Sequence, residues 1–320
     1  METIGVCIVT YNEEKYVSQA IDSVLAQKCS SEIHLYIGQD ASTDGTGDIC
    51  KRYAAEHPDQ ITLITQTQNK GLVANTKDVL ERIVSDGCEY VAMLDGDDFW
   101  TDELKLQKQL TFLQNHPDYG FVHTNQRILY NDTFYKDDIR VDAVSGDLWN
   151  IAGQKGTAIA NCTAFFRTEL LRYCNMQDFI DYGFKSADYP MYIIFMKHAK
   201  FQFLPDVTAV WRRGHCSVSG GGSEEKQIAF LENGIQMWKY LAHLFPDKWT
   251  YSEKNGDTWR RIMKFKIAFR YGDYELANEM VRKGFYTEQD SLSQKLKRLC
   301  ARNRLLFTII YNLKYKRKVY

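Results

Sequence analysis

The sequence predicts an α/β fold, in which a mostly parallel sheet is flanked by helices and followed by a C-terminal helical region. Short apolar runs alternate with segments of helical periodicity near the N-terminus, a pattern typical of β-α-β units. The chain has 320 residues, of which 44% are hydrophobic and 25% charged, as in folded globular proteins. This length allows about two domains, or one large domain with an appendage.

Four apolar runs near the N-terminus are expected to form strands. They read IGVCIVTY, IHLYIG, ITLIT and YVAML. Helices are expected between them over Glu13 to Gln27, after Asp44, and from about Leu72 to Val84. Thr43 or Asp44 is expected to cap the second of these helices.

Polar residues follow three of these strands at the point where each strand ends. They are Thr10, Tyr11, Asn12 and Glu13; Gln39, Asp40, Ser42 and Asp44; and Asp95, Asp97 and Asp98. In open α/β sheets, ligands bind outside the carboxyl ends of the strands. We therefore expect these three polar clusters to converge on one rim of the sheet.

The rest of the chain divides at a glycine-rich stretch. Phe112 to His215 has mixed character, with a helix expected from about Asp188 to His198. The stretch SVSGGGS, residues 217–223, is expected to be a flexible link or a loop, and residues 224–320 have the pattern of helices rich in aromatic residues. We predict one domain over residues 1–220 and a helical region over residues 221–320.

The three carboxylates of Asp95, Asp97 and Asp98 lie within four positions. Like charges at the rim of a core are costly unless a cation or a strong donor balances them. A turn before a helix capped at Thr101 would explain one carboxylate near the turn, but not three. Oxygen ligands so placed suit Mg²⁺ or Mn²⁺ completed by substrate phosphate oxygens. The sequence therefore predicts a divalent metal site that binds a diphosphate.

The segment DGTGDIC, residues 44–50, is the one place that resembles a dinucleotide fingerprint. It follows a predicted strand and opens a predicted helix, but it lacks the third glycine. No lysine-serine pair elsewhere in the sequence forms part of a phosphate-binding loop. These observations argue against a nicotinamide enzyme.

Five motifs, taken in order, resemble the family 2 glycosyltransferases, which have the GT-A fold. They read VTYNEEKYVSQAIDSVLAQ, DASTDGT, NKGLVANT, LDGDDFW and SADYPMYIIFMKHAKFQFLPDVTAVWRRGHCSVSG. The resemblance covers about residues 4–220 and does not extend to the last hundred residues. It implies a nucleotide-sugar-binding half over residues 1–100 and an acceptor-binding half over residues 101–220.

The resemblance also implies roles for residues on the donor side. Thr10, Tyr11 and Glu13 would line the nucleotide pocket, and Asp40 would accept a hydrogen bond from the base, typically uracil. The family commonly has two adjacent acids where this chain has Gln39 and Asp40, which weakens the assignment to the base.

Further roles concern the metal and the chemistry. The resemblance implies that Asp95 contacts the ribose side and Asp97 the metal, that Asp188 is the catalytic base, and that His215 reaches the diphosphate or the metal. Asp188 lies two residues before Pro190 at a predicted helix start, so an ordinary helix cap is the alternative. For His215 the alternative is a solvated loop histidine.

The resemblance thus predicts a metal-dependent enzyme that transfers a sugar from a UDP-sugar, with inversion, to the hydroxyl of a glycan or lipid-linked acceptor in surface polysaccharide or glycan biosynthesis. A nucleotidyltransferase is one alternative, but it would carry a basic, glycine-rich loop where this chain reads TYNEE. A non-catalytic nucleotide-sugar-binding module is another, and it would not need a carboxylate at position 188. A nucleic-acid partner is not predicted.

The N-terminus and the cysteines predict a cytoplasmic location. METIGVCIVTYNEE has an acidic residue at position 2 and an apolar run too short for a signal peptide. The chain has no run of the ~20 apolar residues that a membrane-spanning helix needs. The eight cysteines form no Cys-x-x-Cys pair and are expected to be reduced, so the sequons at Asn131 and Asn161 are expected to be chance matches.

The C-terminal tail has its own charge pattern. After Asp290 the chain has nine lysines and arginines and no acidic residue. In QKLKRLCARNRLLFTIIYNLKYKRK these cations alternate with apolar residues at helical spacing. Two interpretations stay open: a helix packed on its own domain with a solvated basic face, or peripheral contact with an anionic membrane at its inner face, which would suit a lipid-linked acceptor.

Overall fold

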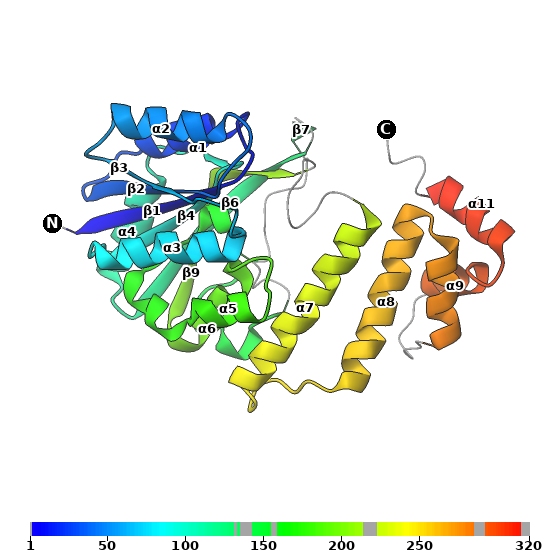
Figure 1. Ribbon diagram of the computed structural model, residues 1–320. Coiled ribbons are helices and arrows are strands. Elements are labelled where there is room, and N and C mark those ends of the chain that lie inside the picture. The colour runs from blue at the N-terminus through cyan, green and yellow to red at the C-terminus, as the bar shows by residue number, and fades with distance from the viewer. Residues whose placement is uncertain are drawn as a thin grey trace. The chain divides into compact units, whose positions relative to one another are not determined.

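The computed structural model describes residues 2–130, 133–134, 143–154, 159–213, 223–284 and 292–314. The chain forms two compact units, residues 1–215 and residues 216–320. The first unit contains the sheet and the second is helical (Figure 1).

The first unit alternates strands and helices along the chain. Its strands are β1 (Thr3–Thr10), β2 (Glu32–Gln39), β3 (Ile61–Thr65), β4 (Tyr90–Asp95), β5 (Phe99–Trp100), β6 (Tyr119–Tyr130), β7 (Thr133–Phe134), β8 (Phe165–Arg167) and β9 (Lys200–Arg213). Its helices are α1 (Val17–Leu25), α2 (Thr46–Glu56), α3 (Leu72–Ser85), α4 (Lys105–Asn115), α5 (Met176–Asp181) and α6 (Asp188–His198), with the 3₁₀ helices η1 (Trp149–Ile151), η2 (Asn161–Thr163) and η3 (Thr168–Tyr173).

The strands form one sheet in the order β3-β2-β1-β4-β8-β6-β9-β5, with β7 paired to β6. Strands β3, β2, β1 and β4 are parallel neighbours. In the second half, β8 runs antiparallel to β4 and β6, and β6 runs parallel to β9. The predicted α/β fold is therefore confirmed, with its parallel character strongest in the first four strands.

Helices cover both faces of the parallel half of the sheet, with α1 and α2 on one face and α3 on the other (Figure 1). Ile4, Val6 and Ile8 of β1 share one buried cluster with residues of α1. A Cβ built on Gly5 would lie 2.7 Å from the Ile83 side chain of α3. Covered on both faces, β1 is a continuous apolar run, as expected for a buried parallel strand.

Two predicted helix starts are wrong, each by about a turn. Helix α1 begins at Val17 instead of Glu13, because the loop before it is held by hydrogen bonds to the next loop: the Glu13 backbone NH donates to Thr46 Oγ1 at 2.8 Å. Helix α4 begins at Lys105, and Thr101 does not cap it: Asp102 Oδ1 accepts from the Leu104 NH at 2.9 Å, while the Thr101 NH donates to the Thr208 carbonyl at 2.9 Å. Helix α6 spans the predicted residues.

The second unit consists of helices. They are α7 (Glu224–Leu244), α8 (Glu253–Tyr271), α9 (Tyr274–Lys283), α10 (Leu292–Cys300) and α11 (Arg304–Lys314). Phe265 and Phe269 of α8 form a buried cluster with Phe307 of α11 and with residues of α9. Among the described residues, none of the helices is long and apolar enough to cross a membrane.

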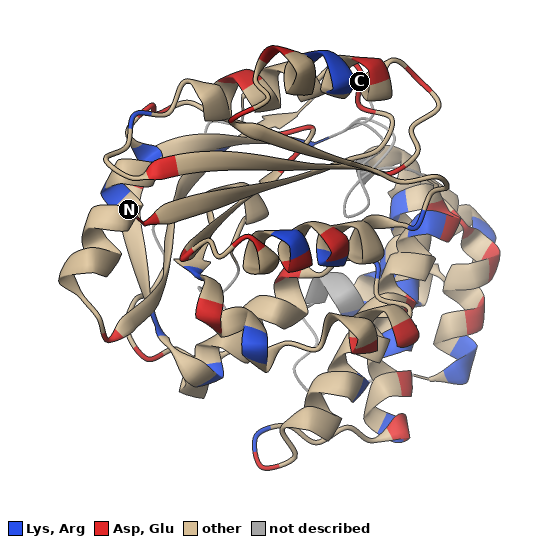
Figure 2. Cartoon of the chain, turned by 60° about the vertical axis from the view of Figure 1, so that its left-hand side comes forward, with Lys and Arg blue, Asp and Glu red and all other residues tan. Residues whose placement is uncertain are grey.

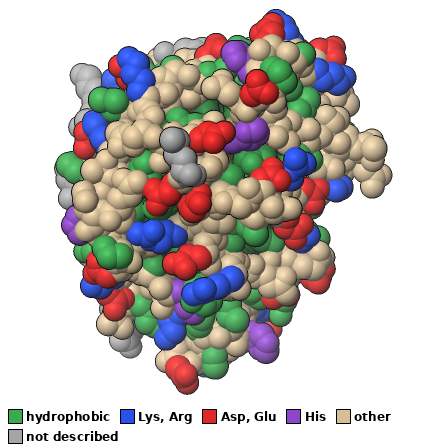
Figure 3. All heavy atoms as spheres, turned by 90° about the vertical axis from the view of Figure 1, so that its left-hand side faces the viewer, with side chains coloured by type: hydrophobic (Ala, Val, Ile, Leu, Met, Phe, Trp, Pro, Cys, Tyr) green, Lys and Arg blue, Asp and Glu red, His purple; other side chains and the backbone are tan. Residues whose placement is uncertain are grey.

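Charged side chains of both signs are interspersed over the helices and loops of the chain (Figure 2). On the face shown in Figure 3, acidic and basic side chains likewise lie among apolar ones. This mixture matches the formal net charge of −1.

Candidate active site

The carboxyl ends of β1, β2 and β4 meet at one rim of the sheet, as predicted. Thr10 at the end of β1 is in register with Gln39 of β2, and Val9 is in register with Asp95 of β4. The loops after β1 and β2 are joined by hydrogen bonds, since Asn12 Oδ1 accepts from the Thr43 NH at 2.8 Å. Residues far apart in the sequence therefore share one edge.

The three aspartates after β4 form an acidic cluster at this rim. Carboxylate oxygens of Asp95, Asp97 and Asp98 all lie within 4.8 Å of one another. Burial, followed by the charge of Asp97, raises the pKa of Asp95 to about 8 and raises that of Asp98 well above its usual range. Repulsion between these buried carboxylates is therefore unfavourable, and a divalent cation would relieve it.

Arg212 of β9 contacts two of these three aspartates. Its backbone NH donates to Asp98 Oδ1 at 2.8 Å, and its Nη1 donates to the Asp97 carbonyl oxygen at 2.5 Å. The guanidinium carbon also lies 4.6 Å from the ring centroid of Phe99 and 4.8 Å from that of Tyr16. Sequence reasoning missed this role, because Arg212 is 114 residues away from Asp98.

Glu13 adds a fourth carboxyl group to the rim. Its Oε2 accepts a hydrogen bond from Thr10 Oγ1 at 2.8 Å. Burial, with the nearby charges of Asp97 and Asp95, raises the pKa of Glu13 well above its usual range. A Cβ on Gly96 would collide with Glu13 Oε2 and lie 2.7 Å from Thr10 Cβ. Glycine between the two aspartates therefore lets the loops after β1 and β4 approach closely.

Asp95 is held by a relay of hydrogen bonds from the second half of the unit. Asn161 Nδ2 donates to Asp95 Oδ1 at 2.9 Å, and Tyr192 Oη donates to Asn161 Oδ1 at 2.6 Å. Tyr192 is 3% exposed and lies on α6, one turn after Asp188. The relay therefore connects the acidic cluster to the helix that carries the predicted base.

Asp188 is the first residue of α6, and the cap position belongs to Ala187. Burial raises the pKa of Asp188, while hydrogen bonds from the Tyr189 NH and the Ser186 side chain act in the opposite direction. The charge of Asp188 in turn raises the pKa of Asp95, so the two carboxyl groups lie within electrostatic reach of one another. A carboxyl group with a raised pKa is suited to accept a proton near neutral pH.

The remaining predicted residues differ in their exposure and contacts. Asp40 is 2% exposed, and its two carboxylate oxygens accept from the NH groups of Lys70 and Gly71 at 2.7 and 2.8 Å. It thereby fixes the turn before α3. Tyr11 is 43% exposed at the rim. His215 lies outside the described residues.

Asn161 and Tyr192 are site residues that sequence reasoning missed. Asn161 was expected to matter only as a chance sequon, yet its side chain bonds to both Asp95 and Tyr192. The cysteines agree better with expectation, because the seven that the structure describes are free thiols.

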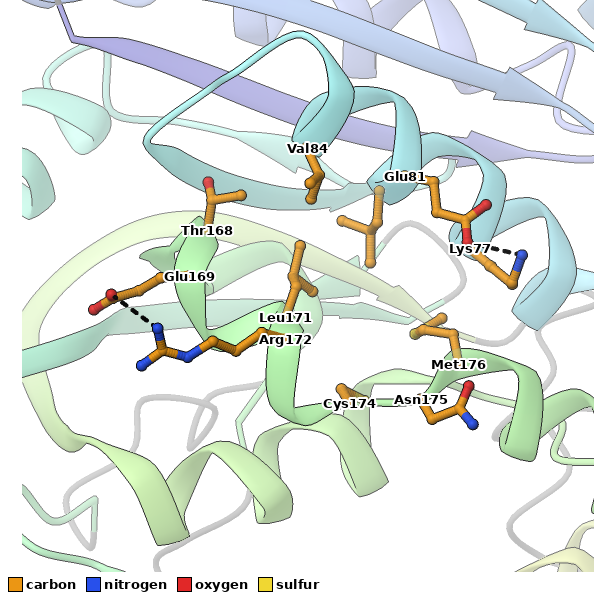
Figure 4. A pocket seen from close by; sticks show the side chains of 11 residues that line it. Lys77, Glu81, Val84, Thr168, Glu169, Leu171, Arg172, Cys174, Asn175 and Met176 are labelled. Carbon is orange, nitrogen blue, oxygen red and sulfur yellow. Dashed lines mark ion pairs between the residues drawn. The ribbon is translucent and has the colours of Figure 1, made fainter.

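A cavity of about 420 Å³ lies elsewhere on the first unit, between α3 and residues 168–176 (Figure 4). Leu80, Val84, Leu171 and Met176 give it an apolar lining. Ion pairs of Lys77 with Glu81 and of Arg172 with Glu169 lie beside these residues. The predicted catalytic and donor-binding residues are not part of its lining.

Comparison with known proteins gives a match to one family over more than half of the chain. The model of glycosyl transferase family 2 matches residues 5–196. The uncharacterized protein Rv1520 of Mycobacterium tuberculosis is 38% identical over 129 residues, which cover 40% of this chain and 36% of that protein. TuaG of Bacillus subtilis, a glycosyltransferase named for teichuronic acid biosynthesis, is 30% identical over 40% of this chain and 56% of its own length. The chain thus matches these relatives over roughly a third to a half of their length.

Solved structures resemble the fold over nearly the whole chain. TarS of S. aureus in complex with UDP-GlcNAc has a TM-score of 0.60 at 17% identity, covering 100% of this chain and 93% of that one. A mannosyltransferase from Pyrobaculum calidifontis, in complex with GDP-Man and Mn²⁺, has a TM-score of 0.57 at 18% identity, covering 99% and 88%. At these identities the likeness is one of fold.

Proposed function

Since this chain belongs to glycosyl transferase family 2 and has the GT-A fold, we propose that it transfers a sugar from a UDP-sugar to an acceptor hydroxyl, with inversion at the anomeric carbon. The observation that carries the proposal is the rim where Asp95, Asp97 and Asp98 lie with Glu13 and within electrostatic reach of Asp188. Acidic side chains suited to a metal-bound diphosphate and a candidate base at the same rim support the proposal.

The donor would lie across the ends of β1, β2 and β4. We assign Thr10, Tyr11 and Glu13 to the nucleotide pocket, Asp95 to the ribose side and Asp40 to the base. Asp40 has a second function in this assignment, because its hydrogen bonds to Lys70 and Gly71 hold the loop beside the pocket. A carboxylate oxygen can accept more than one hydrogen bond, so both functions are compatible.

A divalent cation fits the acidic cluster. Carboxylate oxygens within 4.8 Å of one another are hard ligands, which suit Mg²⁺ or Mn²⁺. We assign Asp97 as the residue that contacts the ion, with His215 as a further candidate that stays a prediction. When bound, the ion would stabilise the negative charge that develops on the diphosphate leaving group.

Asp188 would act as the base of a single displacement. Its carboxylate takes the proton from the acceptor hydroxyl as that oxygen attacks the anomeric carbon from the face opposite the leaving diphosphate. The raised pKa of Asp188 favours proton acceptance, and the hydrogen bonds from Ser186 and Tyr189 fix its direction. One displacement inverts the anomeric carbon and needs no second nucleophilic carboxylate.

We assign the acceptor to residues 101–220, opposite the donor half at residues 1–100. A glycan or lipid-linked acceptor in polysaccharide biosynthesis is the proposed class, supported by the similarity to a relative named for teichuronic acid biosynthesis. The helical region over residues 221–320 would not take part in the chemistry. The cytoplasmic location stays a prediction.

Donor hydrolysis tests this function without a known acceptor. The protein is incubated with UDP-glucose, UDP-GlcNAc, UDP-galactose and GDP-mannose, with Mn²⁺ or with EDTA, and the released nucleoside diphosphate is measured. We expect Mn²⁺-dependent release of UDP from one or more UDP-sugars. Thermal stabilisation by UDP-sugars without any release would favour a binding module, and pyrophosphate release from UTP and a sugar phosphate would favour a nucleotidyltransferase.

A further inference from the structure

One side of helices α10 and α11 is anchored to the second unit. Cys300, Ala301 and Phe307 are 4%, 0% and 1% exposed. The Ala301 carbonyl accepts a hydrogen bond from Asn278 Nδ2 of α9 at 2.7 Å, and Phe307 packs 4.5 Å from the ring of Phe269. This side makes the two helices part of the folded unit.

The same two helices also expose large apolar side chains to solvent. They are Leu296 (53%), Leu299 (59%), Leu305 (69%), Leu306 (43%), Ile309 (45%) and Leu313 (65%), and we call this set the leucine face. At 100° per residue, the four members on α11 fall within a 100° arc of the helix. A helix that only packed on its own unit would not need leucines on its outer side, so this face is suited to an external apolar environment.

The charge of these helices indicates which kind of external surface they would bind. Lys295, Arg302 and Arg304 are exposed on and between α10 and α11, and the sequence after Asp290 has nine cations and no acidic residue. A protein partner with a neutral apolar groove would not explain this imbalance. An anionic surface with apolar material beneath it would satisfy both the cations and the leucines.

We propose that the leucine face and its flanking lysines and arginines bind the surface of a membrane that contains anionic lipids. Helix α11 has 11 residues, or about 16 Å, which is half of what spanning would need, so the helices would lie in the plane of the interface. The leucine side chains enter the acyl boundary while the cations contact headgroup phosphates. This inference does not rest on the proposed sugar transfer.

Co-sedimentation of the full chain with vesicles tests the proposal. We expect binding to vesicles of equal parts phosphatidylglycerol and phosphatidylcholine, at least tenfold weaker binding to pure phosphatidylcholine, and loss of binding at 0.5 M NaCl. The double variant Leu305→Asn, Leu313→Asn should bind at least tenfold more weakly. Leu244→Asn, a matched control because Leu244 of α7 is 40% exposed, should bind as the unchanged chain does.

Three results would overturn the proposal. The first is equal binding of the Leu305, Leu313 variant and the unchanged chain, and the second is absence of binding to anionic vesicles at low salt. The third is a dimer in sedimentation velocity that the same variant abolishes, since the leucine face would then cover a second copy of the chain. Donor hydrolysis should be the same in both chains, so a failure of membrane binding is separable from a failure of the proposed function.

Discussion

Replacing Asp188 by Asn isolates the proposed base from its structural surroundings. The amide has nearly the same volume as the carboxyl group, and its oxygen can still accept hydrogen bonds from the Tyr189 NH and from Ser186. We therefore expect the free energy of unfolding to change by about 1 kcal/mol or less. The transfer rate should fall by about 10²- to 10⁴-fold, the contribution typical of a positioned base.

Donor affinity, unlike the transfer rate, should not fall in this variant. The charge of Asp188 raises the pKa of Asp95, so its removal makes Asp95 easier to ionise. The variant should therefore bind UDP with Mn²⁺ at least as tightly as the unchanged protein, measured by titration calorimetry. Single-turnover kinetics with the donor identified by the hydrolysis panel gives the rate.

The matched control is Asp59→Asn, which removes an exposed carboxylate in the turn before β3, at the opposite edge of the sheet. It should leave both the rate and donor binding unchanged. The account of the base is refuted if Asp188→Asn transfers sugar at close to the unchanged rate. It is also refuted if donor affinity and rate fall together, because Asp188 would then belong to the donor pocket.

Three further predictions follow from the contacts around the acidic cluster. Tyr192→Phe removes the donor to Asn161 Oδ1 and should lower the free energy of unfolding by about 1–3 kcal/mol, with a reduced rate because Asp95 loses its fixed orientation. Gly96→Ala should cost about 1–3 kcal/mol in chemical denaturation, because the new methyl group would lie 2.7 Å from Cβ of the buried Thr10, which cannot move aside as the end of a long side chain can. Burial and the neighbouring charges raise the pKa of Asp95 from its ordinary value of 3.8 to about 8, so its neutral form stabilises the metal-free protein at low pH, and this contribution is lost progressively as the pH rises from about 4 to about 8. The melting temperature of the metal-free protein should therefore fall over this range, and Mn²⁺ should reduce that fall.

Each of these predictions has a control or a contradicting result. Tyr173→Phe removes an exposed hydroxyl that accepts from Arg172 and should change stability by no more than about 0.5 kcal/mol. Gly45→Ala places its methyl group 3.1 Å from the flexible end of Glu14 and should cost less than Gly96→Ala. Equal losses within either pair would contradict the packing argument. A pH profile that Mn²⁺ does not alter would place the metal away from Asp95.

The parallel half of the fold could be predicted because its signals are local. Each of β1 to β4 is an apolar run, β1, β2 and β4 are each followed by a polar cluster, and a parallel sheet brings these ends together without further information. The starts of α1 and α4 could not be predicted, since the residues just before each helix are held by contacts to segments far away in the sequence, from the Glu13 NH to Thr46 and from the Thr101 NH to Thr208. Helical periodicity does not report such contacts.

The support of the acidic cluster could not be predicted either. Asn161 reaches Asp95 across 66 residues because β8 runs antiparallel to β4 and brings the preceding segment η2 beside it. Arg212 reaches Asp98 because β9 pairs with β5. These strands carry no motif that specifies their order in the sheet, so their partners emerge only from the structure.

The dependence of donor binding on metal tests the central claim most directly. Calorimetric titration of UDP into the protein, with Mn²⁺ and with EDTA, should show binding that requires the ion. In Asp97→Ala that requirement should disappear together with donor hydrolysis, because the proposed contact to the ion is lost. Equal UDP affinity with and without Mn²⁺ in the unchanged protein would contradict the claim that the acidic cluster holds a metal-bound diphosphate.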